Sequence, residues 1–471
     1  MSARGAFAKS SLYVLLPGLL VSLGGCGFEH YRARPLQPQV TAARLAARSL
    51  RAPVLRAYLE HALGHRLRHW PLLVWTPRRL TLAALYYNPQ LAAARARMAI
   101  AQAGLSTAAE RPNPSLGIGP GYETFPVSPW TLRLGGLLPI ETAGKRAARM
   151  RVARRQIEMV RFQIASAAWH VRAQLRAALL AFFNARRRLA LLRAAARNSA
   201  QAAQILRRRY QAGEWARPPY LAAERRSIQA QMALEQAQGA FRQARLTLAA
   251  AIGVPASSLR GGRLQWPGFG QPPAPASLPK PQLERWAEIN RLDLRQALAQ
   301  YAVAQANLQS QIALQYPNLN LGPGYSYEEA QSVLRLTLSL VLPVFNHNQG
   351  PIAQAKAERD QLAAAFMALQ ARDRAAAANA WEGYRAAWNA WHTALANERL
   401  AGRVQAAAGQ AMRQGETGKL SYNAARTQSN LARQNTWRAL ANAQAALGQL
   451  EDAVERPLTP AWQLSGKKGK P

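Results

Sequence analysis

Three histidines, His61, His65 and His69, have the residue type and spacing closest to those of a metal site. They lie four positions apart, so on a helix their imidazole rings would share one face and could bind a divalent cation. The chain places no cysteine beside them, and helical spacing directs Glu60 to another face. Two interpretations stay open, a weak metal site and an exposed amphipathic segment, so we assign no metal ligand.

The rest of the chain lacks the residue patterns of common catalytic centres. It contains no phosphate-binding loop, no His-Glu-x-x-His, no Gly-x-Ser-x-Gly and no cysteine-based metal site. The carboxylate pairs Glu328-Glu329 and Glu451-Asp452 fall in segments that we predict as a loop or a tail, without a partner base. We therefore predict that the protein is not an enzyme and uses no cofactor.

Positive charge is the second chemical feature. The chain has 61 Lys+Arg against 23 Asp+Glu, a formal net charge of +38. Such an excess raises nucleic acid or an anionic membrane as a partner. The arginines are spread along every helical stretch, without a basic tail, which favours solvated helix faces and no nucleic-acid partner.

The N-terminus resembles a secretory signal of the lipoprotein type, residues 1–25. Its apolar core, residues 12–23, is too short for a membrane-spanning helix. It ends in Leu23-Gly24-Gly25-Cys26, which resembles a bacterial lipobox, so we expect Cys26 to be lipidated. The residue after the cysteine is Gly27 and not aspartate, a pattern that resembles that of lipoproteins sent to the outer membrane. The alternative is an ordinary signal with an incidental cysteine.

Short strand patterns follow a first helical stretch. Leu116 and Ile118 stand between small residues, and the segment from Trp130 alternates Leu132 and Leu134 with polar or small residues. Period-two alternation is typical of a strand with one apolar face. The proline-containing segment 123–129 between them suits a hairpin connection.

This hairpin occurs twice. Gly119-Pro120-Gly121-Tyr122 matches Gly322-Pro323-Gly324-Tyr325, and Leu132-Arg133-Leu134 matches Leu334-Arg335-Leu336. The offset stays near ~200 residues, which indicates a tandem duplication of a whole unit.

Long helices flank both hairpins. Residues 142–211 contain no proline and would form a helix of ~105 Å, which implies coiled-coil packing. Gly213 and Gly415 lie where each long helix must turn into a return helix. The expected helices are residues 76–110, 142–211 and a return helix to about 253, then 283–316, 350–414 and a return helix to about 455. The expected segments are a signal peptide (1–25), an N-terminal extension (26–75), a first repeat (76–252), a Pro/Gly-rich linker (253–282), a second repeat (283–455) and a C-terminal tail (456–471).

Four amphipathic strands cannot span a bilayer alone, because an open sheet edge leaves backbone groups unpaired in lipid. Three copies would supply twelve strands, enough to close a barrel with a water-filled interior. The alternative is a soluble hairpin with one face packed on the helices. The residues that alternation directs to lipid are Leu132, Leu134, Leu334, Leu336, Leu338 and Leu340. Those directed to the lumen are Thr131, Arg133, Arg335, Thr337 and Ser339, the two arginines forming a basic lining.

The order helix, strand pair, ~100 Å helix, glycine turn and return helix, present twice, resembles the TolC-type outer-membrane efflux family. The likeness spans residues 76–455. It is carried by residues 80–104 and their counterpart 291–309, and by the turns at 210–221 and 413–422. The resemblance implies a mainly α fold with a small β part. Long antiparallel helices would form an α-barrel, and four strands per chain would complete a 12-stranded β-barrel in a homotrimer.

The same resemblance implies a passive conduit of a tripartite efflux system, contacting outer-membrane lipid. The protein would be lipid-anchored in the bacterial outer membrane, extend into the periplasm, and meet a periplasmic adaptor and an inner-membrane RND-type pump. The main alternative is a structural coiled-coil envelope lipoprotein without a pore, which leaves the duplicated hairpins without a purpose. Metal ions, drugs, solvents and proteins all stay open as cargo. The histidine stripe and a likeness to metal-efflux members favour metal ions slightly.

Carried over residue by residue, the resemblance implies adaptor-docking tips at the two helix turns. The matching residues are Tyr210, Gly213, Leu221, Gly415, Leu420 and Tyr422. In this family acidic residues often ring the entrance, whereas this chain has arginines there. They are Arg207, Arg208, Arg209, Arg225, Arg226, Arg413 and Arg426. This departure predicts a positive entrance that favours anionic or neutral cargo, or, as an equal alternative, arginines that face solvent or contact the adaptor.

Overall fold

The computed structural model describes residues 29–124 and 129–464. The predicted signal peptide and Cys26 lie outside the described residues. The chain divides into two compact units, Met1–Ala47 and Arg48–Pro471. The described part of the first unit contains helix α2 (Pro38–Ala46). The second unit holds both repeats.

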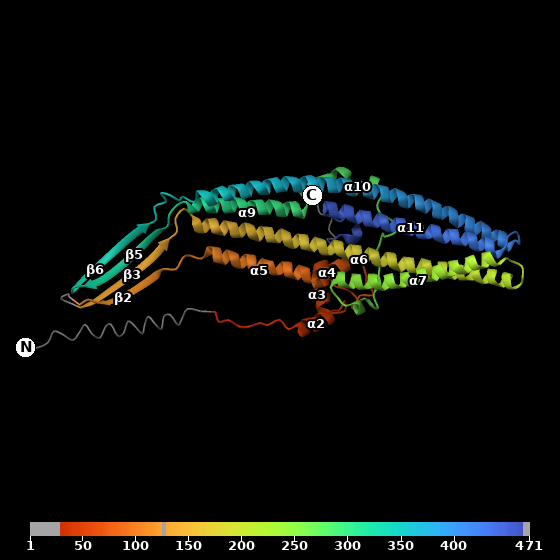
Figure 1. Ribbon diagram of the computed structural model, residues 1–471, viewed down its shortest axis with the longest axis horizontal. Helices are drawn as coiled ribbons and strands as arrows, with labels where there is room; N and C mark the ends of the chain where they lie inside the picture. The colour runs from red at the N-terminus through yellow and green to blue at the C-terminus, as the bar shows by residue number, and fades with distance from the viewer. Residues whose placement is uncertain (1–28, 125–128, 465–471) are drawn as a thin grey trace, which may run out of the picture. The chain divides into compact units, whose positions relative to one another are not determined.

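Helices dominate the second unit (Figure 1). None of the described helices is both long and apolar enough to cross a membrane. The helices up to the middle of the chain are α3 (Pro53–Leu63), α4 (Pro77–Tyr87), α5 (Pro89–Ala109), α6 (Lys145–Gln211) and α7 (Arg217–Ile252). Those of the second repeat are α8 (Lys280–Ile289), α9 (Leu292–Leu314), α10 (Gln349–Arg413) and α11 (Lys419–Val454).

The helix expected over residues 76–110 is broken in two at Asn88. Pro89 lacks an N–H and restricts the residue before it, so Asn88 is extended, with φ −66° and ψ 122°. Its Oδ1 accepts hydrogen bonds from the N–H groups of Gln90 (2.9 Å) and Leu91 (3.3 Å), which caps α5. The helix expected over 283–316 is likewise broken, between α8 and α9, at an extended Arg291.

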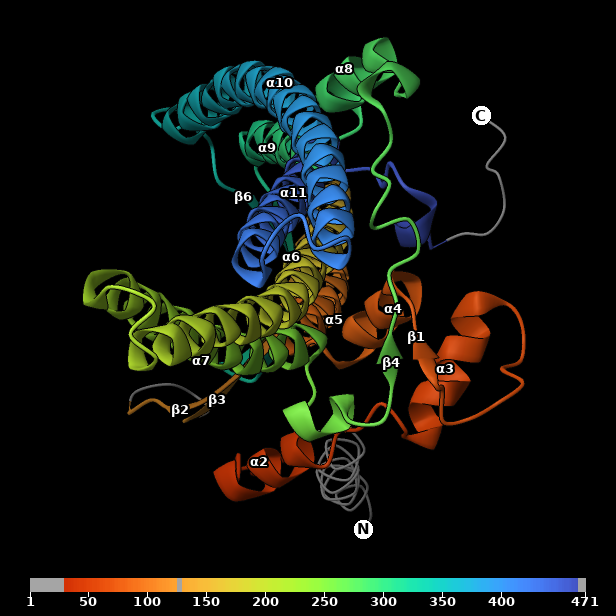
Figure 2. The ribbon, with the colours of Figure 1, turned by 90° about the vertical axis from the view of Figure 1, so that its right-hand side faces the viewer.

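The long helix α6 is the centre of the molecule. It packs against α5 and α7 of its own repeat and against α9 and α11 of the other (Figure 2). The helix α10 packs against α8, α9 and α11, and α7 lies on the opposite side of α6. Because α7 and α10 form the two borders of this arc of helices, each has a side that no other described helix covers.

The four strands form one antiparallel sheet in the order β2-β3-β5-β6, so the two hairpins lie side by side. It extends beyond one end of the long helices (Figure 1). Among the described residues no helix packs against either face of the sheet. The strands are β2 (Ser115–Tyr122), β3 (Trp130–Ile140), β5 (Leu319–Glu328) and β6 (Gln331–Leu340).

The N-terminal extension and the Pro/Gly-rich linker are not loose connections. Their short strands β1 (Val74–Trp75) and β4 (Arg263–Leu264) pair in parallel. Trp266 contacts Phe269 and the ring of Trp462, which is 1% exposed. The tail that we expected to be loose therefore packs, as far as Trp462, against the linker and the middle of α6. Burial of these large aromatic rings stabilises the segment although it is rich in turn residues.

Candidate functional site

The register of the sheet gathers the apolar side chains on one face. Residues directly opposite each other in an antiparallel pair point to the same side. Ile118 pairs with Leu134, Leu134 with Tyr325, and Tyr325 with Leu334. We call this side the apolar face, and its residues are Leu116, Ile118, Pro120, Tyr122, Trp130, Leu132, Leu134, Gly136, Leu138, Ile140, Leu319, Leu321, Pro323, Tyr325, Tyr327, Ser332, Leu334, Leu336, Leu338 and Leu340.

This apolar face is open to the surroundings in the single chain. Leu334 is 84% exposed and Leu336 73%. A contiguous apolar surface of this kind marks a contact with another protein or with a membrane. The expected alternative, a hairpin packed by one face on its own helices, therefore does not describe this sheet.

The other side of the sheet is the polar face. It carries six of the seven strand glycines, at 117, 119, 121, 135, 322 and 324. A Cβ added at Gly121 would lie 2.5 Å from Oγ1 of Thr131, which shows how crowded this side is. Thr131 and Ser326 on the same side are buried, although no helix covers them. Glycines on one face let a sheet curve toward it.

The two arginines predicted for the lumen do lie on the polar face. The Nε of Arg133 contacts Oε1 of Glu328 at 2.6 Å, in an ion pair open to solvent. Arg335 lies opposite Gly324 and forms no ion pair within the described residues. Of the two arginines expected to form a basic lining, Arg133 is paired with Glu328, and Arg335 has no carboxylate partner among the described residues.

The dimensions of the sheet match those of a membrane strand. β3 has 11 residues. At about 3.3 Å per residue and a tilt of about 45°, it rises by roughly 25 Å, the height of the apolar band of an outer-membrane barrel. Tyr122 and Trp130 meet edge to face at the hairpin end of the apolar face, with ring centroids 5.2 Å apart. Aromatic rings of this kind form the girdles of such barrels.

At the other end of the molecule the two long helices turn back in the same way (Figure 1). Gly213 (φ +75°) and Gly415 (φ +81°) adopt the left-handed conformation. The N–H of Glu214 donates to the Arg209 carbonyl, and that of Glu416 to the Ala411 carbonyl, both at 2.9 Å. These are the contacts of a Schellman turn, which requires a left-handed residue that glycine provides without strain.

The two turns share more than their glycines. Each reads Gly-Glu-x-x, then Arg217 or Lys419, and three residues later Tyr220 or Tyr422. Tyr220 stacks on Tyr210 with ring centroids 5.3 Å apart. Tyr220 was not among the residues predicted for the tip, although this shared spacing indicates it. The other predicted tip residues divide by exposure: Tyr210 and Leu221 are exposed, whereas Leu420 and Tyr422 are half-buried.

The arginines near the turns lie on open helix surfaces. Arg207, Arg208, Arg225, Arg226 and Arg413 are exposed. Arg209 and Arg426 are half-buried.

Arg209 and Arg426 are each half-buried by a contact with a neighbouring side chain. The guanidinium of Arg209 lies over the Trp215 ring, 5.4 Å from its centroid. Arg426 donates to Oε1 of Gln201 at 3.4 Å. Close to it, Asn198 of α6 donates to Oγ1 of Thr427 on α11 at 2.7 Å, which ties the two hairpins together.

The three histidines do not share a helical face. Helix α3 ends at Leu63, because Gly64 adopts the left-handed conformation (φ +73°). His61 therefore lies in the last helical turn, and His65 and His69 follow in irregular chain. Within the described residues no group of three or more His, Cys, Asp or Glu could hold a metal ion.

Glu60 has a structural role beside these histidines. Its Oε1 accepts from the Leu67 N–H at 3.0 Å and pairs with Arg56 at 2.9 Å. The Leu67 hydrogen bond and, second, the Arg56 hydrogen bond lower the pKa of this carboxyl below its usual value.

The prediction that Glu451-Asp452 lies in an unpaired tail is wrong. Both residues belong to α11, and Glu451 is fully buried between two arginines of α6. Its Oε2 accepts from Nη2 of Arg172 at 2.8 Å and from Arg176. Its Oε1 accepts from the Leu458 N–H at 2.8 Å. Because every contact of this carboxylate is internal, the cluster joins helices and offers no catalytic base.

The second carboxylate pair is also placed by the structure. Glu328 ends β5 and carries the contact with Arg133, and Glu329 begins the turn that follows.

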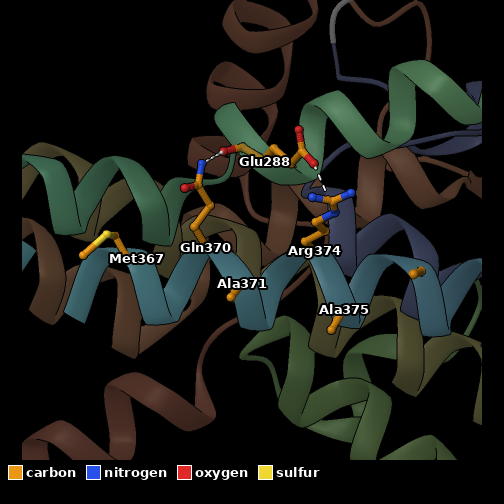
Figure 3. Close-up of a pocket in the computed structure, with 7 residues that line it drawn as sticks. Glu288, Met367, Gln370, Ala371, Arg374 and Ala375 are labelled. Carbon is orange, nitrogen blue, oxygen red and sulfur yellow. Dashed lines mark hydrogen bonds and ion pairs between the residues drawn. The ribbon is translucent and has the colours of Figure 1, made fainter. Parts of the chain in front are cut away.

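An open groove of about 630 Å³ lies between α8 and α10 (Figure 3). Its polar groups satisfy one another. Gln370 donates to the backbone carbonyl of Glu288 at 3.1 Å, and Arg374 contacts the Glu288 carboxylate at 3.5 Å. Alanines make up much of the remaining wall. The groove therefore shows no set of convergent polar groups that would select a ligand.

Comparison with known proteins identifies a similar family and similar relatives. Residues 81–254, which make up most of the first repeat, match the family described as "Outer membrane efflux protein". Over these residues the chain is similar to outer membrane efflux proteins. It is 28% identical over 237 residues to the cobalt-zinc-cadmium resistance protein CzcC of Cupriavidus metallidurans, which is 49% of this chain. The match spans about half (54%) of that relative's length.

Solved structures of outer membrane proteins share the fold along most of the chain. The outer membrane protein VceC of Vibrio cholerae superposes with a TM-score of 0.63 at 16% identity, covering 81% of this chain and 97% of that one. The outer-membrane channel OprN gives 0.64 at 18%, covering 90% and 98%. CusC gives 0.64 at 14%, covering 91% and 99%. The predicted fold class of this chain, mainly α with a small β part, is confirmed.

Proposed function

We propose that three copies of this chain form a channel-tunnel through the bacterial outer membrane, a passive conduit of a tripartite efflux system. One observation carries the proposal. A four-stranded sheet, which no described helix covers on either face, has a continuous apolar face and a glycine-rich polar face at the end of two long helical hairpins. Such a sheet is stable in lipid only when its edges are paired.

Three copies satisfy that requirement. The strands β2 and β6 form the edges of the sheet, each paired on one side only within the described residues. Joining β6 of one copy to β2 of the next gives twelve strands, with the glycine-lined polar faces inside and the leucines toward lipid.

The helices support the same threefold arrangement. On α7, Ile228 and Met232 are exposed, and on α10, Leu400 and Val404 are exposed, each pair one helical turn apart. These helices are the borders of the arc. Packing α7 of one copy near α10 of the next would bury both stripes and close an α-barrel below the sheet.

The remaining parts of the proposal rest on the similarity to outer membrane efflux proteins. The helix turns would dock on a periplasmic adaptor that links the conduit to an inner-membrane RND-type pump. Lipidation of Cys26 would anchor each chain to the outer membrane. The cargo we propose is a divalent metal cation, because the relative CzcC is named for resistance to cobalt, zinc and cadmium. A pore-free coiled-coil lipoprotein would leave the exposed apolar face without a partner.

Two measurements test this function. Protein extracted from outer membranes in mild detergent should migrate on a denaturing gel as a large species that boiling converts to single chains. In planar bilayers it should form long-lived water-filled channels. A chain that is released from membranes without detergent and gives no conductance would contradict the proposal. For the cargo, a strain that lacks this protein should become sensitive to cobalt, zinc or cadmium. Unchanged tolerance of all three metals would reject the proposed cargo but not the proposed channel.

A further inference from the structure

The end of the molecule opposite the sheet has an excess of positive charge that the chain does not neutralise. Between residues 205 and 226, at the α6–α7 turn, six arginines stand against two glutamates. The α10–α11 turn adds Arg413, Lys419 and Arg426 against Glu416. Within the described residues no ion pair joins any of these cations to a carboxylate.

The charge is concentrated on the first hairpin. Arg207 and Arg208 end α6, and Arg225 and Arg226 follow on the first turns of α7, all exposed. Like charges this close repel one another, and solvent alone screens them over about 8–10 Å at physiological salt. In the proposed trimer three such turns would gather at one end, so their fields would add.

Aromatic rings lie among these arginines. Trp215 is 37% exposed beneath the guanidinium of Arg209, and Tyr210 is exposed and held flat against Tyr220. Rigid aromatic rings beside arginines are the residue types that dominate binding energy in protein interfaces. In the second turn, Thr417 stands in the place of Trp215. The first turn thus combines charge with a contact surface, whereas the second has less of both.

We infer that the tip of the α6–α7 hairpin binds a periplasmic protein whose docking surface is rich in Asp and Glu. The inference rests on the proposed function, because it assigns the chemistry of the partner that docks at this end. Complementary charge would speed the encounter and select the first hairpin over the second. The alternative explanation, that the positive charge at the tip attracts cargo, is weaker, because a positive tip repels the cations proposed as cargo.

The first experiment identifies the partner and its contact surface. A photocrosslinking amino acid is placed in the full-length protein in cells at Gln211 on the first turn, at Gln414 on the second and, as a control, at Gln282 on α8; all three are exposed. Crosslinked peptides are then read by mass spectrometry. We expect a periplasmic protein at Gln211 whose crosslinked segment has more Asp and Glu than Lys and Arg, and no such product at Gln282.

The second experiment measures binding of that crosslinked protein to the purified, detergent-solubilised efflux protein. The tip variant reverses Arg207, Arg208 and Arg225 to Glu. The matched control reverses Arg97, Arg161 and Arg242, which are exposed, distant from the tip and without ion pairs in the described part of the chain. We expect the tip variant to bind roughly tenfold more weakly or worse, and the control to bind like wild type. Binding to wild type should weaken as NaCl rises from about 50 to about 300 mM.

Three other results would contradict parts of this inference. A crosslinked segment that is neutral or basic, or equal binding of the tip variant and the control, overturns the acidic partner while leaving the conduit intact. A tip variant that changes ion selectivity in bilayers but not binding assigns the arginines to cargo instead. Absence of a crosslink at both turns rejects docking at this end, and with it that part of the proposed function. Matching circular dichroism and gel migration of all variants ensures that folding is not what differs.

Discussion

Arg176 of α6 donates to the buried carboxylate of Glu451 on α11, a residue 275 positions further along the chain. The same carboxylate accepts from Arg172, so two cations of the first repeat share one anion of the second. Trp462 and Trp266 lie close to the Arg176 guanidinium and help to exclude water. The contact holds the long helix of one repeat against the return helix of the other at mid-height.

Glu451→Gln should destabilise the protein strongly. It would leave two buried guanidinium groups with less compensation, which costs about 3–5 kcal/mol in comparable buried pairs. The measurement is the temperature at which the detergent-solubilised protein loses its helical circular dichroism. Glu382→Gln, which removes the exposed partner of Arg385, should cost about 0.5 kcal/mol or less. Equal effects of the two substitutions would show that the buried cluster does not stabilise the fold.

Asp452, next to this cluster, should make stability depend on pH. Burial raises the pKa of its carboxyl above the usual value, although Arg172 acts in the opposite direction. A carboxyl with a raised folded-state pKa contributes stability at pH below its unfolded pKa of about 3.9 and loses it as pH rises through the folded value. At neutral pH the ionised group therefore costs stability.

Asp452→Asn should accordingly be as stable as wild type or more so at about pH 7.5. The difference should shrink as the pH falls toward the unfolded-state pKa of about 3.9, because the wild-type carboxyl is then increasingly protonated. Thermal unfolding measured across this pH range checks this. A variant that is less stable at neutral pH would mean that the charge of Asp452 is needed to balance the arginines.

The hairpin between β5 and β6 stores strain in its two-residue turn. Glu329 (φ 51°) and Ala330 (φ 63°) both adopt the left-handed conformation, which favours Asn-Gly in such turns. Ala330→Gly should stabilise the protein by about 1 kcal/mol, seen as a higher dissociation temperature on unboiled gels. Ala396→Gly, on the exposed surface of α10, should destabilise by about 0.5–1 kcal/mol. A loss at position 330 would contradict the assigned turn.

The polar face should set the ion preference of the pore. Arg335 is without a carboxylate partner among the described residues, whereas Glu328 balances Arg133. Arg335→Gln should therefore lower anion preference by about twofold, and Glu328→Gln should raise it by releasing Arg133. Reversal potentials in a KCl gradient across planar bilayers measure both. Unchanged potentials in both variants would place these residues outside the conducting path.

The strands and turns could be predicted from the sequence because their signals are local. Period-two alternation sets the face of each side chain, and Gly213 and Gly415 stand where the chain needs a left-handed residue. Adjacency of the two hairpins follows from β3 pairing with β5, a long-range contact that no local pattern encodes.

Two kinds of feature were not predicted: a helix break with a weaker local signal than its surroundings, and contacts between residues far apart in the chain. The break at Pro89 was visible in the sequence, but the apolar periodicity on both sides of it dominated the helix prediction. The packed domain built from the extension and linker depends on Trp75, Trp266 and Trp462, which lie far apart in the chain and meet only after folding. Burial of Glu451 likewise needs α6 to lie beside α11.

The central claim is that the sheet is completed by other copies of the chain, with β2 of one next to β6 of another. Disulfide crosslinking between these two edges tests it most directly, with one cysteine placed on β2 (residues 116–120) and one on β6 (residues 334–338) in a scan of pairs. At least one register should give, on oxidation in membranes, a covalent species of three chains that resists boiling and disappears on reduction. If every pair yields only single chains, the barrel of three copies is wrong.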